Sequence, residues 1–74
     1  MQALSQAKPG ETYTIHWMFG LPDVLDFLHS RHVEEGGTVR VIQQCRDGVI
    51  IGVRDVRLAL GSEVADRIKV GDYS

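Results

Sequence analysis

The sequence contains almost no cysteine and no long apolar run. Cys45 is the one cysteine among the 74 residues, which excludes an intramolecular disulfide and a multi-thiolate metal centre and favours a reducing compartment. The most apolar stretch, VIIGV at 49–53, is too short to span a bilayer. The first eleven residues lack the apolar run of a signal peptide. We therefore expect a cytoplasmic protein with no direct membrane insertion.

Concentrated positive charge is also missing from the sequence. Eight Lys and Arg residues are scattered among ten acids, and the net charge is −2. Proteins that bind nucleic acid usually carry a basic stripe, and one Trp, two Tyr and two Phe offer little aromatic surface for base stacking. We expect no nucleic-acid partner.

The length leaves little room for an enzymatic cleft. A chain of 74 residues forms one domain at most, here residues 1–74, and buries only about 60% of its unfolded surface. Cys45 has no adjacent histidine and belongs to no Cys-His-Asn pattern, so the sequence does not indicate a nucleophile. We expect neither catalysis nor a required cofactor.

Alternation of apolar and polar residues predicts several short strands. In ETYTIHWM at 11–18, Tyr13, Ile15 and Trp17 fall on one face, as in a half-buried strand. Asp47-Gly48 predicts a type I′ hairpin turn. The other strands are expected at 38–44, 49–54, 56–60 and 67–70.

One amphipathic segment, LPDVLDFLHSR at 21–31, predicts a helix. Pro22 suits the first turn, and Asp23 and Asp26 carry the negative charge that is favoured near a helix N-terminus. Spaced three and four residues apart, the side chains expected to face the core are those of Leu21, Val24, Leu25 and Leu28.

A strand, a helix and four more short strands do not form a βαβ series. Short strands with tight turns favour a mainly β fold, a small antiparallel barrel of about five strands. The one short α-helix follows the first strand and is expected to cover an open side. Near the C-terminus, Ser62 is expected to cap a short helical turn.

The order and spacing of these pieces resemble the FeoA family, ferrous iron transport protein A. Leu4 and KPGE at 8–11 resemble the family's opening leucine and Pro-Gly turn. LHSRHVEEGGTVRV at 28–41 resembles its helix end and the glycine turn before a strand. The most specific match is the terminal LALG-x-E-x-A-x-x-I-x-V pattern, here Leu58, Ala59, Leu60, Gly61, Glu63, Ala65, Ile68 and Val70.

This resemblance implies an SH3-like β-barrel and a function in bacterial ferrous iron transport. It implies a small cytoplasmic accessory or regulatory protein that binds FeoB, a membrane permease with a cytosolic GTPase domain. Iron would then be handled by that partner. Two alternatives stay open. One is a metal-binding or metal-sensing SH3-like domain similar to the barrel of iron-dependent repressors; the other is a generic protein-interaction module.

The sequence departs from the family pattern at three places. His32 and Asp55 stand where the family usually has glycine, so we predict positive φ at both positions, which His and Asp tolerate better than most residues. The hairpin at 44–48 is about two residues shorter and lacks the family's Pro-containing loop.

His29 and His32 are the weak candidates for metal ligands. Their spacing of three residues could place both rings near one ion, with Glu34 or Glu35 completing the site. The alternative is structural: His29 faces solvent and His32 ends the helix as its C-terminal cap. We favour the cap and expect no metal site.

Phe27 falls outside the apolar stripe of the helix, between Asp23 and Arg31 on the helical wheel. Its ring could fold onto the barrel, or it could be an exposed anchor for a partner, because aromatic residues and arginine are frequent binding hot spots. We predict a docking surface around 21–31. Its partner-binding residues are Leu21, Asp23, Phe27 and Arg31.

Overall fold

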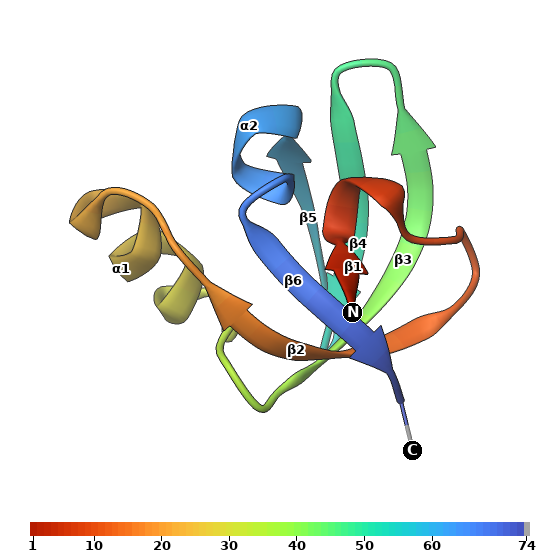
Figure 1. Ribbon diagram of the computed structural model, residues 1–74, viewed down its shortest axis with the longest axis horizontal. Helices are drawn as coiled ribbons and strands as arrows, with labels where there is room; N and C mark the ends of the chain where they lie inside the picture. Colours follow the sequence, from red (N-terminus) through yellow and green to blue (C-terminus); the bar gives the residue numbers. More distant parts are fainter. Residues whose placement is uncertain (74) are drawn as a thin grey trace.

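The computed structural model describes residues 1–73. It contains six antiparallel strands in one sheet, with a helix between β2 and β3 (Figure 1). No helix within this range is long and apolar enough to cross a membrane. In chain order the elements are β1 (Gln2–Ala3), the 3-10 helix η1 (Leu4–Gln6), β2 (Thr12–Met18), α1 (Pro22–Ser30), β3 (Thr38–Cys45), β4 (Gly48–Val53), β5 (Val56–Gly61), α2 (Ser62–Ala65) and β6 (Ile68–Asp72).

The mainly β, SH3-like architecture predicted from the sequence is confirmed, with two differences. The sheet has the strand order β1-β6-β2-β3-β4-β5, so it has six strands rather than about five. The extra strand, β1, has only two residues, too few for an alternating pattern to show. Among the described residues the sheet does not close, and β1 and β5 are its two edges.

One apolar cluster fills the space inside the curved sheet. Leu4 of η1 is fully buried in it. The side-chain amide of Gln44 holds η1 in place by donating to the carbonyl oxygens of Leu4 at 3.1 Å and Ala7 at 2.8 Å. The cluster comprises Leu4, Ala7, Tyr13, Ile15, Leu28, Val33, Val39, Val41, Val49, Ile51, Val53, Leu60, Ala65, Ile68 and Val70.

Irregular pairing in two strands changes which residues point inward. The β2–β6 register shifts between Ile15 and Trp17. The alternation of inward-facing and outward-facing side chains along β2 therefore changes phase after His16. Trp17 is therefore 38% exposed, and Met18 packs against the core in its place. The prediction that Trp17 shares the buried face of Tyr13 and Ile15 was wrong, because the two sides of a β-bulge are out of phase.

Two predictions about the tight turns were wrong. Cys45 pairs with Gly48, so the turn residues are Arg46 and Asp47. Neither has positive φ, so the type I′ turn at Asp47-Gly48 was wrong. In the next hairpin Arg54 has φ 56°. Positive φ was predicted for Asp55, which was also wrong, because in this two-residue turn the first position takes the left-handed conformation.

The C-terminus of α1 forms a Schellman motif. The His32 amide donates to the His29 carbonyl at 3.0 Å, and the Val33 amide donates to the Leu28 carbonyl at 2.9 Å. His32 has φ 66°, which confirms the prediction of positive φ. Leu28 and Val33 are both buried, as expected for the hydrophobic contact that accompanies this motif.

Two smaller predictions about helix ends were wrong. Ser62 is the first residue of α2 and Gly61 is its N-cap, with no side-chain cap hydrogen bond. Leu21 is the N-cap of α1 and is 71% exposed. It does not belong to the core-facing stripe, because the chain enters α1 from an extended residue and not from a helical turn.

His32→Gly is expected to leave the free energy of unfolding unchanged or to raise it by up to about 1 kcal/mol. Glycine removes the cost of the left-handed conformation, and its larger unfolded-state entropy offsets part of that gain. Urea denaturation measures the difference. His29→Gly is the control, because it places glycine inside α1 and should cost about 1 kcal/mol. Equal losses in both variants would contradict the expected relief of strain.

Candidate docking surface

Helix α1 is attached to the rest of the molecule mainly through its C-terminal half. Leu28 is the one fully buried residue of the helix, and Val24 and Leu25 are partly buried against the core. In Figure 1 the start of α1 projects away from the sheet and its end leads back toward β3. One flank of the helix consequently faces β5, which is an edge strand of the sheet, and the short helix α2 that follows it.

A largely apolar groove of about 310 Å³ lies along this flank. Its α1 wall consists of Asp23, Val24, Phe27 and Leu28, and its other wall consists of Ala59, Leu60 and Gly61 of β5 with Val64 of α2. Asp23 is the one charged residue in this lining. The groove therefore suits an apolar side chain of a partner.

Phe27 forms an exposed part of the groove wall. Its side chain is 44% exposed, and the guanidinium carbon of Arg31 lies 5.2 Å from the centroid of its ring. A guanidinium group at this distance is attracted to the face of the ring. The contact restrains the ring without covering it, so Phe27 remains available to a partner.

The four predicted partner-binding residues lie in different places. Asp23 and Phe27 line the groove, and the guanidinium group of Arg31 lies over the ring of Phe27. Leu21 is exposed but does not line the groove. The sequence did not predict the opposite wall of the groove, because that wall comes from residues 59–64, which are distant from α1 in the sequence. The signal was present in the LALG motif, which supplies three of the lining residues.

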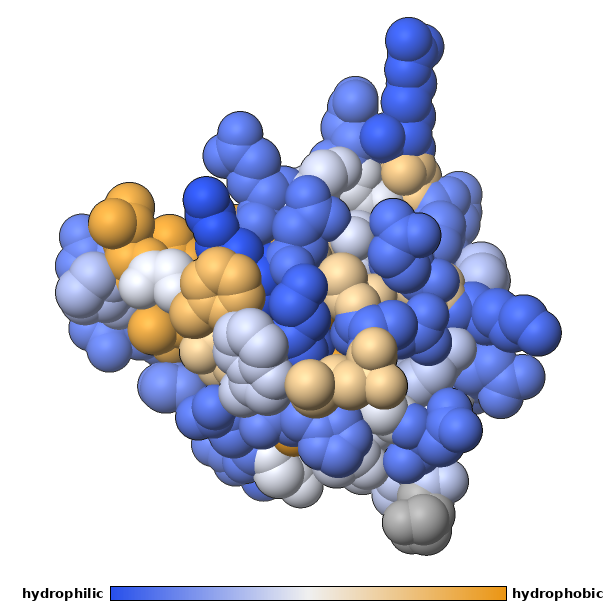
Figure 2. Space-filling model, viewed as in Figure 1, coloured by the Kyte–Doolittle hydropathy of each residue, from blue (hydrophilic) through white to orange (hydrophobic). Residues whose placement is uncertain are grey.

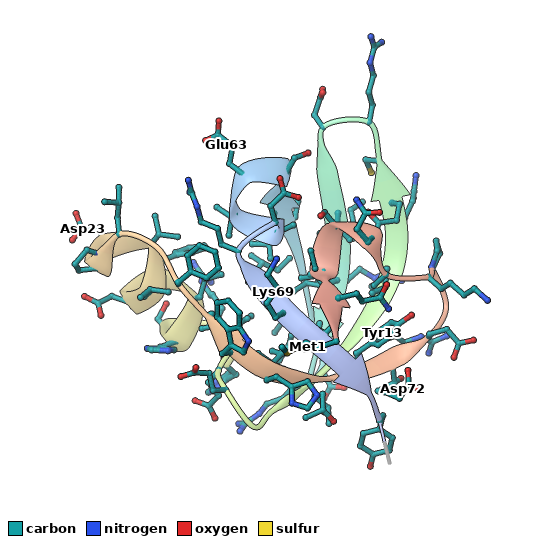
Figure 3. The ribbon with its side chains drawn as sticks, in the orientation of Figure 1. Met1, Tyr13, Asp23, Glu63, Lys69 and Asp72 are labelled. Carbon is teal, nitrogen blue, oxygen red and sulfur yellow. The ribbon has the colours of Figure 1, made fainter. Side chains whose placement is uncertain are left out.

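The acidic residues near this region stand at its outer ends. In Figure 3, Asp23 lies at the outer end of α1 and Glu63 at the outer side of α2. Asp23 lines the groove, whereas Glu63 lies outside its lining.

A second apolar feature lies at the end of β2. The rings of Trp17 and Phe19 are stacked with centroids 5.0 Å apart, and Phe19 is 45% exposed. Figure 2 shows apolar surface at the α1 end of the molecule and across the centre of this face. Phe19 therefore matches Phe27 in residue type and exposure, but it lies outside the groove.

Among the residues that the structure describes, His29 and His32 are not grouped with a third potential metal ligand. His32 turns out of the helix in the left-handed conformation, and both His29 and His32 are exposed. Within residues 1–73, no group of three or more His, Cys, Asp or Glu residues is arranged to hold a metal ion. This geometry gives the metal-ligand alternative no support. The expectation that the chain needs no cofactor stays a prediction.

The model of the FeoA domain family matches residues 2–71 of the chain. The crystal structure of an iron uptake regulatory protein (FeoA) is 30% identical to it, with a TM-score of 0.82, and the match covers 92% of each chain. The solution structure of the FeoA protein from Chlorobium tepidum is 19% identical, with a TM-score of 0.89, over 99% of this chain and 71% of that one. No curated protein matches the chain significantly.

The same fold occurs as part of larger proteins. A manganese-dependent transcriptional repressor, in complex with manganese, is 19% identical with a TM-score of 0.88. The match covers 97% of this chain but 36% of the repressor chain. At this identity the similarity shows the fold alone.

Proposed function

The chain belongs to the FeoA family, and on that premise we propose that it is an accessory or regulatory protein of ferrous iron transport that binds a FeoB-type permease. The part of the permease to which the chain binds in this proposal is its cytosolic portion. In this proposal the permease handles ferrous iron and hydrolyses GTP, and the chain supplies a docking surface without catalysis or a cofactor of its own.

The apolar groove between α1 and the β5–α2 edge supports this proposal. It is the place where an exposed aromatic side chain, apolar walls and a family motif coincide. Interface hot spots are typically aromatic or arginine side chains in a pocket that a partner can close from water. Phe27, with Arg31 beside it, has this character.

Phe27→Ala is expected to weaken binding to the permease about tenfold or more, because truncating a hot-spot aromatic costs at least about 1–2 kcal/mol of binding free energy. The measurement is isothermal titration calorimetry against the isolated cytosolic portion of a FeoB-type permease, repeated with the detergent-solubilised permease.

Phe19→Ala is the matched control. The two phenylalanines are 45% and 44% exposed, so both variants remove similar apolar surface, but only Phe27 lines the groove. Phe19→Ala should change the affinity less than threefold. If Phe19→Ala abolished binding and Phe27→Ala did not, the docking surface would lie at the end of β2 and the groove would be rejected.

A further inference from the structure

A second concavity, of about 420 Å³, lies on the outer face of the sheet next to the β4–β5 hairpin. Its charged lining residues are Arg40, Arg54, Arg57 and Asp55. Three of the protein's eight basic residues thus surround one hollow, although they are scattered along the sequence. The sheet register brings them together.

Arg40 on β3 and Arg57 on β5 flank Gly52 of the strand between them. Gly52 pairs with Arg40 on one side and with Arg57 on the other. Directly paired residues of neighbouring strands share a face, and here the face is the outer one, because both arginines are exposed. Two strand spacings separate their backbones by about 10 Å. A small oxyanion between them would be within reach of both guanidinium groups.

Gly52 carries no side chain in the middle of this row, and the side chain of Ile42 lies beside it. The position of a Cβ on Gly52 would lie 3.3 Å from Cδ1 of Ile42. The floor of the hollow therefore combines a bare backbone with an aliphatic side chain. A larger residue at position 52 would fill the hollow and press on Ile42.

Arg54 adds a third positive charge from the turn. It holds φ 56°, a conformation that most side chains adopt only at a cost in energy. Within residues 1–73, no side-chain hydrogen bond involves a guanidinium group of Arg40, Arg54 or Arg57. Their donors face water and are available to a ligand.

We propose that this hollow, formed by Arg40, Arg54 and Arg57 around Gly52, binds a dianionic oxyanion of the phosphate class. Three guanidinium groups against the one carboxylate of Asp55 leave an excess of positive charge that a dianion matches. Guanidinium groups recognise phosphate through paired N–H donors. The hollow is large enough for a phosphate group alone or for one attached to a small molecule. The proposal does not depend on permease binding at the groove.

Nuclear magnetic resonance titration of the whole chain with inorganic phosphate tests the proposal. At constant ionic strength set with sodium chloride, the backbone amides of Gly10, Gly52 and Arg54 should shift and saturate with a dissociation constant of about 1 mM. Adenosine monophosphate is the second probe. Equal affinity points to free phosphate as the ligand, and tighter binding points to a phosphate-bearing small molecule.

Three variants separate a binding site from general attraction of anions. Arg40→Gln combined with Arg57→Gln should weaken phosphate binding about tenfold or more, since two charge-assisted hydrogen bonds are lost. Asp55→Asn should strengthen it about twofold to fivefold, since a like charge is removed. Arg46→Gln, at the other hairpin and outside the hollow, should change the affinity less than twofold.

The proposal is overturned if the shifts grow linearly with phosphate without saturating, or if Arg46→Gln weakens binding as much as the double variant. It is also overturned if Asp55→Asn weakens binding. The substituted arginines are exposed, so the variants are expected to fold. Heteronuclear NMR spectra of each variant, recorded before the titration, check that the fold is retained.

Discussion

Gly48→Ala is expected to lower the free energy of unfolding by about 3 kcal/mol. A Cβ at position 48 would overlap the carbonyl oxygen of Leu60 and would lie 3.1 Å from its carbonyl carbon. These are backbone atoms of the neighbouring strand, so no side chain can rotate away, and the β4–β5 pairing itself must shift. Overpacking of this kind typically costs 1–3 kcal/mol and occasionally more. A core of this size supplies only about 3–5 kcal/mol of stability.

Urea denaturation followed by circular dichroism measures this loss, and Gly61→Ala is the control. Gly61 pairs directly with Gly48 across the sheet, but a Cβ on Gly61 would meet no atom within 4 Å. Its variant should change stability by less than about 1 kcal/mol, a balance between a poorer N-cap and lower unfolded-state entropy. Similar losses in the two variants would show that close approach at Gly48 is not the cause.

Leu28→Ala is expected to cost about 3 kcal/mol and to release α1 from the sheet. Leu28 is 1% exposed, and replacing a buried leucine by alanine removes its apolar contacts and leaves a cavity, at a cost of 2–5 kcal/mol. Because it is the one fully buried residue of α1, the loss also falls on the helix that forms one wall of the groove. Permease binding should weaken with it.

Hydrogen exchange of the α1 amides, measured alongside urea denaturation, follows both effects. Leu21→Ala is the matched control within the same segment, because Leu21 is 71% exposed and its variant should change stability by less than about 0.5 kcal/mol. If α1 kept its protection from exchange in Leu28→Ala, anchoring through Leu28 would be wrong.

The local sequence predicted the features that local chemistry determines. The end of α1 is an example: a left-handed residue at position 32 follows from the helix pattern and the family's glycine, and the structure has it. The helix after the first predicted strand and the mainly β architecture followed from periodicity in the same way. These features depend on residues within a few positions of one another.

The features that the sequence did not predict depend on how distant strands pair. Trp17 does not lie on the buried face, because the β2–β6 register shifts beside it. The register depends on how two strands pair, and the periodicity within one strand does not determine it. The left-handed residue of the second hairpin is Arg54 instead of Asp55, because the pairing of Val53 with Val56 defines the turn.

The candidate groove was predicted only on one side for the same reason. Asp23 and Phe27 were found from the helical wheel of α1, where the periodicity of 3.6 residues is strong. Ala59 and Val64 complete the groove from the β5–α2 segment. Their position opposite α1 depends on the curvature of the whole sheet, which no pattern within either segment expresses.

The pairing of β1 with β6 affects the order in which the sheet forms. Gln2 lies opposite Val70, and Leu4 belongs to the same core as Val70. Because β6 is the strand that pairs with β1, β1 has no strand partner until β6 is in place. Contacts so distant in sequence form slowly. The pairing of these two strands is therefore expected to be a late step of folding, after the β3–β4 and β4–β5 hairpins have formed from residues close in sequence.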